Sequence, residues 1–252
     1  MPSVFIRILL SIFAVSWLLA GCASTSTPET GGPENIFNLA KSAYADEDYL
    51  EAQRLFDVVK LQYPASQFAD DAQYYLAEIN FKREEYVLAA FAYTQLRRSY
   101  PNSEYYREAL FKTALSYYQL SPTYDRDQEY TRRAIQSFAD YQMLYAGDSL
   151  ANESTAKIRE LRNKLAQREF STAELYLKLE SPKSAVIYFD AVINDYSDTD
   201  FYEQAIAGKA EALSQLRNTE EARRTVDLYV KNFPQGKFRG RMDELAAQLP
   251  RR

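Results

Sequence analysis

The chain has 252 residues, a formal net charge of −5 and 46% hydrophobic residues, enough for a folded core. The acidic balance argues against nucleic acid as the main partner, because nucleic-acid-binding domains are usually basic. The sequence has no histidine and one cysteine, which excludes histidine-dependent nucleophilic catalysis, most zinc sites and an internal disulfide. We therefore predict a protein that is not an enzyme and that needs no cofactor or metal ion.

The first 21 residues are predicted to be a lipoprotein signal peptide. Arg7 precedes an apolar run over residues 8–19, which is short for a membrane span. The cysteine, Cys22, follows the letters LAG, and this order of apolar residue, two small residues and cysteine resembles the bacterial lipobox. We expect cleavage before Cys22 and acylation of its thiol. An ordinary signal peptide with a coincidental cysteine is the alternative.

Residues 22–33 are predicted to be the lipidated cysteine followed by a flexible tether of Ser, Thr, Pro and Gly. Ala23 and Ser24 stand where lipoproteins retained in the inner membrane typically carry Asp. The resemblance to lipoprotein signals therefore implies the outer membrane. Acyl chains would anchor the folded part there, on the periplasmic face.

A repeat governs the rest of the chain, residues 34–252. Tyr63-Pro64 recurs as Tyr100-Pro101 and as Phe233-Pro234, so the basic spacing is 37 residues. The tetratricopeptide repeat is a pair of helices with a period of about 34 residues, and this chain resembles it with three extra residues between repeats. Small Ala residues let paired helices approach, and Pro64, Pro101 and Pro234 end the hairpins they follow. We predict an all-α tetratricopeptide-repeat solenoid of five helical hairpins plus a C-terminal capping helix.

Two insertions interrupt the period. Eight extra residues, 121–128, are expected to form a loop inside the third hairpin. In that loop we interpret Asp125 and Asp127 as helix caps and ion-pair partners of Arg126 rather than as catalytic carboxylates. Fourteen more residues enter the fourth unit without Pro or Gly, which predicts one long helix over 149–179. The capping helix is expected over 237–249.

Several local motifs resemble one family. The motifs are YPNS at 100–103, DRDQ at 125–128, LRNKLA at 161–166, AELY at 173–176 and DYSDT at 195–199. Together with the lipobox and five repeats, they resemble the BamD family of outer-membrane β-barrel assembly lipoproteins over nearly the whole chain. The chain departs from the family at Gln128, where the family has Pro, and at the Gly-free turn 180–183. It also departs at Tyr188, where an Arg is usual.

The resemblance implies a scaffold in the barrel-assembly machinery. Such a protein would contact the barrel-forming subunit and accessory lipoproteins, and would bind unfolded outer-membrane proteins. The alternative is a periplasmic repeat scaffold for cell-envelope division or peptidoglycan coordination. Arg162 and Arg168 on the long helix, together with Tyr188, are the candidate docking residues. A solvated helix face is the other interpretation of the two arginines.

Aromatic residues recur at two positions of each first helix, seven residues apart, and predict a peptide-binding groove. They are Phe37, Tyr74 and Phe111 at the first position and Tyr44, Phe81 and Tyr118 at the second. Phe170 and Leu177 continue the two rows. The alternative, equally open, is that these rings fill the seam between neighbouring repeats.

Overall fold

The computed structural model describes residues 31–250, which form eleven helices and no strands. The predicted signal peptide and Cys22, the predicted acylation site, lie outside the described residues. The helices are α2 (Pro33–Ala45), α3 (Tyr49–Gln62), α4 (Ala69–Lys82), α5 (Tyr86–Ser99), α6 (Tyr106–Leu120), α7 (Glu129–Leu144), α8 (Ser149–Lys178), α9 (Pro182–Asp195), α10 (Tyr202–Gln215), α11 (Thr219–Asn232) and α12 (Arg239–Gln248). Within residues 31–250, no helix combines the length and the apolar character needed to cross a membrane.

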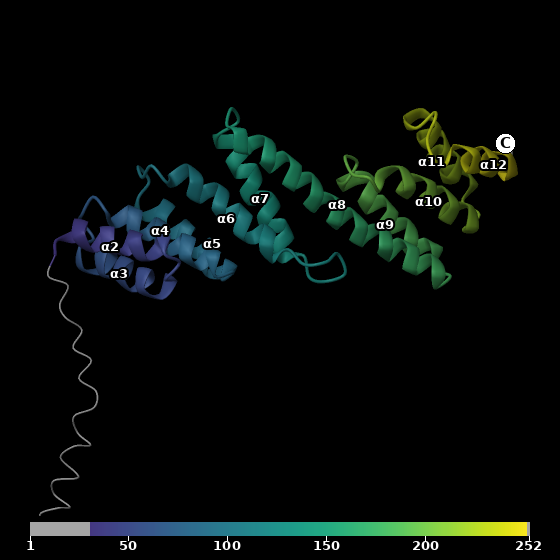
Figure 1. Cartoon of the computed structure of the whole chain (residues 1–252). Helices are drawn as coiled ribbons and strands as arrows, with labels where there is room; N and C mark the ends of the chain where they lie inside the picture. The colour runs from purple at the N-terminus through teal and green to yellow at the C-terminus, as the bar shows by residue number, and fades with distance from the viewer. Residues whose placement is uncertain (1–30, 251–252) are drawn as a thin grey trace, which may run out of the picture.

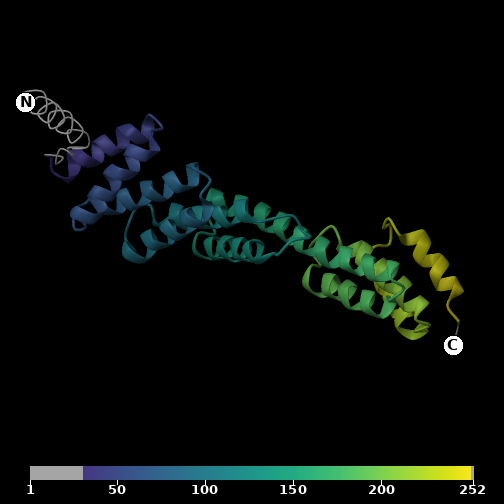
Figure 2. The ribbon, with the colours of Figure 1, turned by 90° about the horizontal axis from the view of Figure 1, so that it is seen from below.

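Consecutive helices pack as antiparallel pairs, and each pair stacks on the next. The pairs are α2–α3, α4–α5, α6–α7, α8–α9 and α10–α11, while α12 packs on α11 and α10. The stack is elongated, with α2 and α12 at opposite ends in both views (Figures 1 and 2). The predicted solenoid of five hairpins plus a capping helix is confirmed, and α12 is shorter than expected by three residues.

Four hairpins close through the same turn. In each, a residue with a left-handed backbone follows the first helix: Glu47, Glu84, Glu180 and Arg217, with φ between 53° and 60°. In the turn of hairpin four, the Glu180 N–H donates to Leu177 O and the Ser181 N–H donates to Tyr176 O. These two bonds define a Schellman motif, which satisfies the last carbonyls of a helix. The third hairpin instead carries the predicted loop, because α6 ends at Leu120 and α7 begins at Glu129.

The long helix α8 belongs to two hairpins at once, as predicted from the second insertion. Leu161 is buried against α6 and α7 with Leu110 and Phe138. Only five residues further on, Ala166 is buried with α9 and α10. The first half of α8 therefore covers hairpin three, and its second half is the first helix of hairpin four. Figure 1 shows α8 spanning the middle of the molecule.

An aromatic residue stands at the N-cap of most first helices, a feature missed in the sequence. These N-cap residues are Phe68, Tyr105, Phe201 and Phe238. Each of the first three packs on the first-helix ring of the preceding hairpin: Phe68 on Phe37, Tyr105 on Tyr74, and Phe201 on Phe170. Three of the four seams between neighbouring hairpins therefore contain an aromatic pair, which is stacked in the first two and tilted in the third. The same 37-residue spacing that revealed the hairpins separates Phe68 from Tyr105 and Phe201 from Phe238.

Candidate functional site

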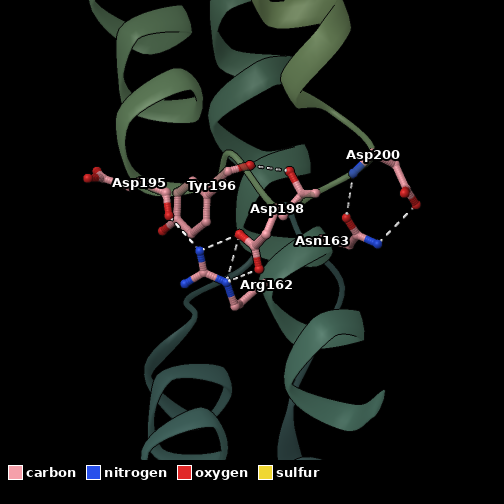
Figure 3. A network of polar contacts seen from close by, with 7 residues as sticks. Arg162, Asn163, Asp195, Tyr196, Asp198 and Asp200 are labelled. Atoms are coloured by element: carbon pink, nitrogen blue, oxygen red, sulfur yellow. Dashed lines mark hydrogen bonds and ion pairs between the residues drawn. The ribbon is translucent and has the colours of Figure 1, made fainter. Parts of the chain in front are cut away.

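The turn between α9 and α10 is fastened to the middle of α8. The Arg162 Nε donates to Asp198 Oδ2 at 2.8 Å, and its Nη2 donates to Asp195 O at 2.7 Å. The Arg162 guanidinium also lies 5.4 Å from the ring centre of Tyr196 (Figure 3). The hydrogen bond and charge of this guanidinium hold the pKa of the Asp198 carboxyl below its usual value. Arg162 is thus satisfied within the chain.

The neighbouring residue Asn163 completes this attachment. Its Oδ1 accepts a hydrogen bond from the Asp200 N–H at 2.9 Å, and its Nδ2 donates to Asp200 Oδ2 at 3.0 Å (Figure 3). Both bonds end on one residue of the α9–α10 turn. One helical turn of α8 therefore holds the α9–α10 turn, which leads into hairpin five.

The loop of hairpin three meets the same stretch of α8. Lys164 Nζ donates to Ser121 Oγ at 2.8 Å, and Arg168 Nη1 donates to Arg126 O at 3.5 Å. Burial lowers the pKa of the Lys164 ammonium. The middle of α8 is therefore a junction where the α6–α7 loop and the α9–α10 turn meet.

Gln128 closes the α6–α7 loop from inside. Its side chain is fully buried, and its Nε2 donates to Thr123 O at 2.7 Å and to Arg126 O at 3.0 Å. Asp127 Oδ1 accepts a bond from the Glu129 N–H at 2.9 Å and so satisfies the first N–H of α7 from the position before the N-cap, which is Gln128. A hydrogen bond with the Thr123 side chain and, to a smaller extent, the charge of Arg126 lower the pKa of the Asp125 carboxyl. Within residues 31–250, no ion pair at contact distance joins Arg126 to either aspartate. The buried amide satisfies loop carbonyls directly.

An open hollow of about 520 Å³ lies at this junction. Tyr124 from the loop, Lys164 and Gln167 from α8, and Phe201 contribute to its walls. The described residues contain no cluster of acidic or sulfur side chains that could hold a metal ion. The walls mix one ammonium, the carboxylates of Asp125 and Glu160, and amide groups with aromatic rings. This chemistry suits contact with a polypeptide.

The first row of the predicted groove is buried in the core. Phe37, Tyr74 and Phe111 are all inaccessible, and each packs on rings of its own or the next hairpin. Their burial supports the packing alternative for this row. A partner could reach these three rings only if the repeats separated.

The second row is half-buried, and each ring is covered from the next repeat. Tyr44 meets the Tyr75 ring at 5.1 Å, and Lys112 Nζ lies 5.1 Å from the Phe81 ring centre. Tyr118 lies 4.0 Å beneath Lys157 Nζ and donates to Glu160 Oε2 at 2.8 Å. Burial, followed by this bond, raises the pKa of Tyr118 to about 12. The row retains exposed edges, so a role in peptide binding stays a prediction.

Tyr188 lies on α9 and stacks on Tyr176 of α8, with ring centres 5.3 Å apart. The neighbouring phenol of Tyr176 raises the pKa of Tyr188. Three apolar side chains on the same two helices are strongly exposed, namely Leu175, Leu179 and Ile187. Hairpin four therefore offers an aromatic pair and apolar side chains, beyond the single residue singled out in the sequence.

A family model described as an outer membrane lipoprotein, YfiO, matches residues 30–237, almost the entire stack of hairpins. The chain belongs to the YfiO family. Its relatives include proteins called outer membrane protein assembly factor BamD. The relative from Neisseria gonorrhoeae is 24% identical over 249 residues, covering 92% of this chain and 93% of its own length. The one from Caulobacter vibrioides is 26% identical over 221 residues, covering 86% and 72%. The resemblance to BamD proteins is confirmed.

Solved tetratricopeptide-repeat structures are also similar to this YfiO-family chain. The TPR2AB domain of yeast Sti1, in a complex with pHSP90, matches with a TM-score of 0.45 and 12% identity, covering 80% of this chain and 78% of that one. The TPR domain of P58(IPK) matches with a TM-score of 0.44 and 16% identity, covering 81% and 52%. Neither carries a conclusion about binding.

Proposed function

We propose that the chain is a non-enzymatic, lipid-anchored subunit of the machinery that assembles β-barrel proteins in the outer membrane. The observation that carries the proposal is the family match over residues 30–237, together with relatives that are called outer membrane assembly factors. The solenoid provides a long rigid surface without enclosing a catalytic pocket, which suits a scaffold. Acylation of Cys22 would confine it to the periplasmic face of that membrane and raise its effective concentration near partners.

In this proposal, hairpin four docks the barrel-forming subunit through Tyr188 and its exposed apolar neighbours. Arg162 contributes by fixing the α9–α10 turn, and Arg168 by holding the α6–α7 loop. The earlier hairpins receive unfolded outer-membrane proteins along the exposed edges of Tyr44, Phe81 and Tyr118. Accessory lipoproteins are further expected partners.

The test is a detergent pull-down of the tagged, lipidated full chain from its own outer membrane, analysed by mass spectrometry. We expect a large barrel protein with periplasmic domains in near-equal amount. Ile187→Ser, with Tyr188→Ala as a second variant, should reduce that recovery about tenfold, because exposed apolar anchors dominate many interfaces. Leu50→Ser is the matched control, since Leu50 is exposed on α3 in the first hairpin. Recovery of division or peptidoglycan proteins instead would support the alternative scaffold and reject the barrel-assembly proposal.

A further inference from the structure

The outer side of α5 exposes an apolar row that no other described helix covers. Val87, Leu88 and Phe91 are 50%, 54% and 62% exposed. Single exposed hydrophobic residues are normal, but these three fall within little more than one turn of one helix. Because residues three and four apart share a helix face, the row continues from Phe91 to Gln95 and Arg98.

Phe91 stands between two hollows. One, of about 270 Å³, lies towards α3, and its walls include the amide side chains of Gln53 and Asn80. The other, of about 260 Å³, lies towards α7, and its walls include the rings of Tyr117 and Tyr130. Phe91 and Gln95 line both hollows. The apolar row therefore separates two hollows, which lie between α5 and the second helices of hairpins one and three.

The charge along the row changes from neutral to positive. Helix α5 has no acidic residue and ends in Arg97-Arg98, although the whole chain has a net charge of −5. Arg98 is exposed and forms no ion pair within residues 31–250. Across the second hollow, the Arg133 guanidinium lies 5.8 Å from the Tyr117 ring centre and 5.9 Å from that of Tyr130. From Phe91 to Arg98 the helix rises about 10 Å.

We propose that this face of α5 docks an acidic amphipathic segment of a partner protein. An apolar side chain of the segment enters a hollow beside Phe91, and carboxylates about two helical turns further along meet Arg98 and Arg133. Arg98, which has no ion pair among the described residues, provides the positive charge that the carboxylates of the segment would meet. Gln95 lines both hollows, so its amide can hydrogen-bond a segment in either one. The surface uses other helices than Tyr188 and the predicted aromatic groove, so it adds a partner beyond the proposed function.

An anionic bilayer is the other surface that combines apolar and negative groups. Membrane-binding patches typically use about four to eight clustered basic residues on a protruding face. Here the two hollows have three cationic groups, Lys60, Arg98 and Arg133. Lys60 pairs with Asp57 at 3.6 Å and Arg133 pairs with Glu129 at 2.8 Å, which leaves Arg98 as the cation without an ion pair among residues 31–250. Hollows with amide walls fit a polypeptide, whose backbone offers donors and acceptors. A protein segment is therefore the favoured occupant.

Photo-crosslinking in living cells tests the proposal on the full lipidated chain. A photoreactive residue is introduced as Phe91→p-benzoylphenylalanine, with Leu61→p-benzoylphenylalanine as the matched control on exposed α3 surface. We expect position 91 to crosslink to a protein segment in which carboxylates flank an apolar residue. Arg98→Glu should reduce the yield about tenfold through charge repulsion, whereas Lys231→Glu on exposed α11 should leave it unchanged. Crosslinks to lipid or to a basic segment, equal yields at 91 and 61, or insensitivity to Arg98→Glu would each overturn the proposal.

A defined peptide gives an independent measurement. The probe is a synthetic helical peptide of about 16 residues with Leu at two successive turns and Glu about two turns further along. We expect Phe91→Ala to raise its Kd about tenfold, with the melting temperature nearly unchanged because the ring is mostly exposed. Leu61→Ala should leave the Kd as in the original chain. Equal binding of a peptide with Lys in place of Glu, or unchanged binding to the Phe91→Ala protein, would contradict the α5 site.

Discussion

Arg162 on α8 binds Asp198, which lies 36 residues further along the chain in the α9–α10 turn, through two guanidinium nitrogens. The same guanidinium holds the Asp195 carbonyl. An arginine fork suits this task because it makes parallel bonds of fixed geometry. If hairpin four docks a partner as proposed, Arg162 contributes by holding the α9–α10 turn, and its loss would act on that partner indirectly.

Asp198→Asn should destabilise the chain by about 0.5–1 kcal/mol at pH 7, since both side chains are partly exposed and the pair is screened by solvent. The lowered pKa of Asp198 gives the sign of the pH dependence. The carboxylate contributes fully above its unfolded pKa of about 4, and its contribution is lost as the pH falls through the lower folded value. Urea unfolding at pH 7 and at pH 3 should therefore show a smaller difference between Asp198→Asn and the original chain at the lower pH.

The matched control for that experiment is Asp227→Asn, a change at an exposed position of α11. Its free energy of unfolding should follow the original chain at both pH values. A difference between Asp198→Asn and the original chain that persists at pH 3 would mean that charge pairing is not the source of the stability.

Phe111→Ala should destabilise by about 3–5 kcal/mol, because a buried aromatic ring leaves a cavity when it is removed. The ring contacts Phe138 and Tyr141 in the interior of hairpin three. The double variant Tyr44→Ala with Tyr118→Ala should lose less per residue, since both rings are only half-buried. Thermal and urea unfolding measure both. A loss for the double variant as large per ring as for Phe111→Ala would assign the second row to the core and remove it from any peptide groove.

Glu84→Gly should stabilise the second hairpin by about 0.5–1 kcal/mol. Glu84 has φ 60°, a left-handed conformation in which a side chain is strained and glycine is not. Glu180→Gly, in the turn that departs from the family pattern, should behave alike, because the Schellman bonds are identical. Differential scanning calorimetry should show a higher melting temperature for both. Lys82→Gly, at an exposed helical position of α4, is the control and should lower the melting temperature.

The hairpins could be predicted from the sequence because their signals are local: the spacing of Ala, Pro after the second helix of hairpins one, two and five, and a second insertion without Pro or Gly. The burial of the two aromatic rows could not be predicted from the sequence, because it depends on residues of the neighbouring repeats. Phe81 is covered by Lys112 of the next hairpin, and Tyr118 by Lys157, which belongs to the inserted half of α8. A count of aromatic spacing within one helix carries no information about such covers.

The docking residues illustrate the same limit. Arg162 was singled out for its charge, yet its partner lies beyond the whole of α9. The N-cap aromatic residues could have been predicted from the sequence, since Phe68 and Tyr105 are separated by the same 37 residues as the other repeated positions. They were missed because N-cap positions are ordinarily examined for small polar residues.

A buried charge network joins hairpins two and three. Glu78 is 6% exposed, accepts a hydrogen bond from the Tyr93 hydroxyl, and pairs with Lys112 Nζ at 3.0 Å. Lys112 at the same time lies over the ring of Phe81. Removing one partner of a buried pair leaves the other charge uncompensated, which costs more than the pair contributes.

Lys112→Met should therefore destabilise the chain by about 3 kcal/mol, because the Glu78 carboxylate keeps only the Tyr93 hydroxyl as a partner. Adding Glu78→Gln to that variant should recover much of the loss, since no buried charge then remains. Urea unfolding of the two variants at pH 7 measures the recovery, with Lys82→Met on the exposed end of α4 as the control. If Lys112→Met were as mild as Lys82→Met, or if Glu78→Gln added a further loss, the carboxylate would be solvated in solution and the two hairpins would be held by aromatic packing alone.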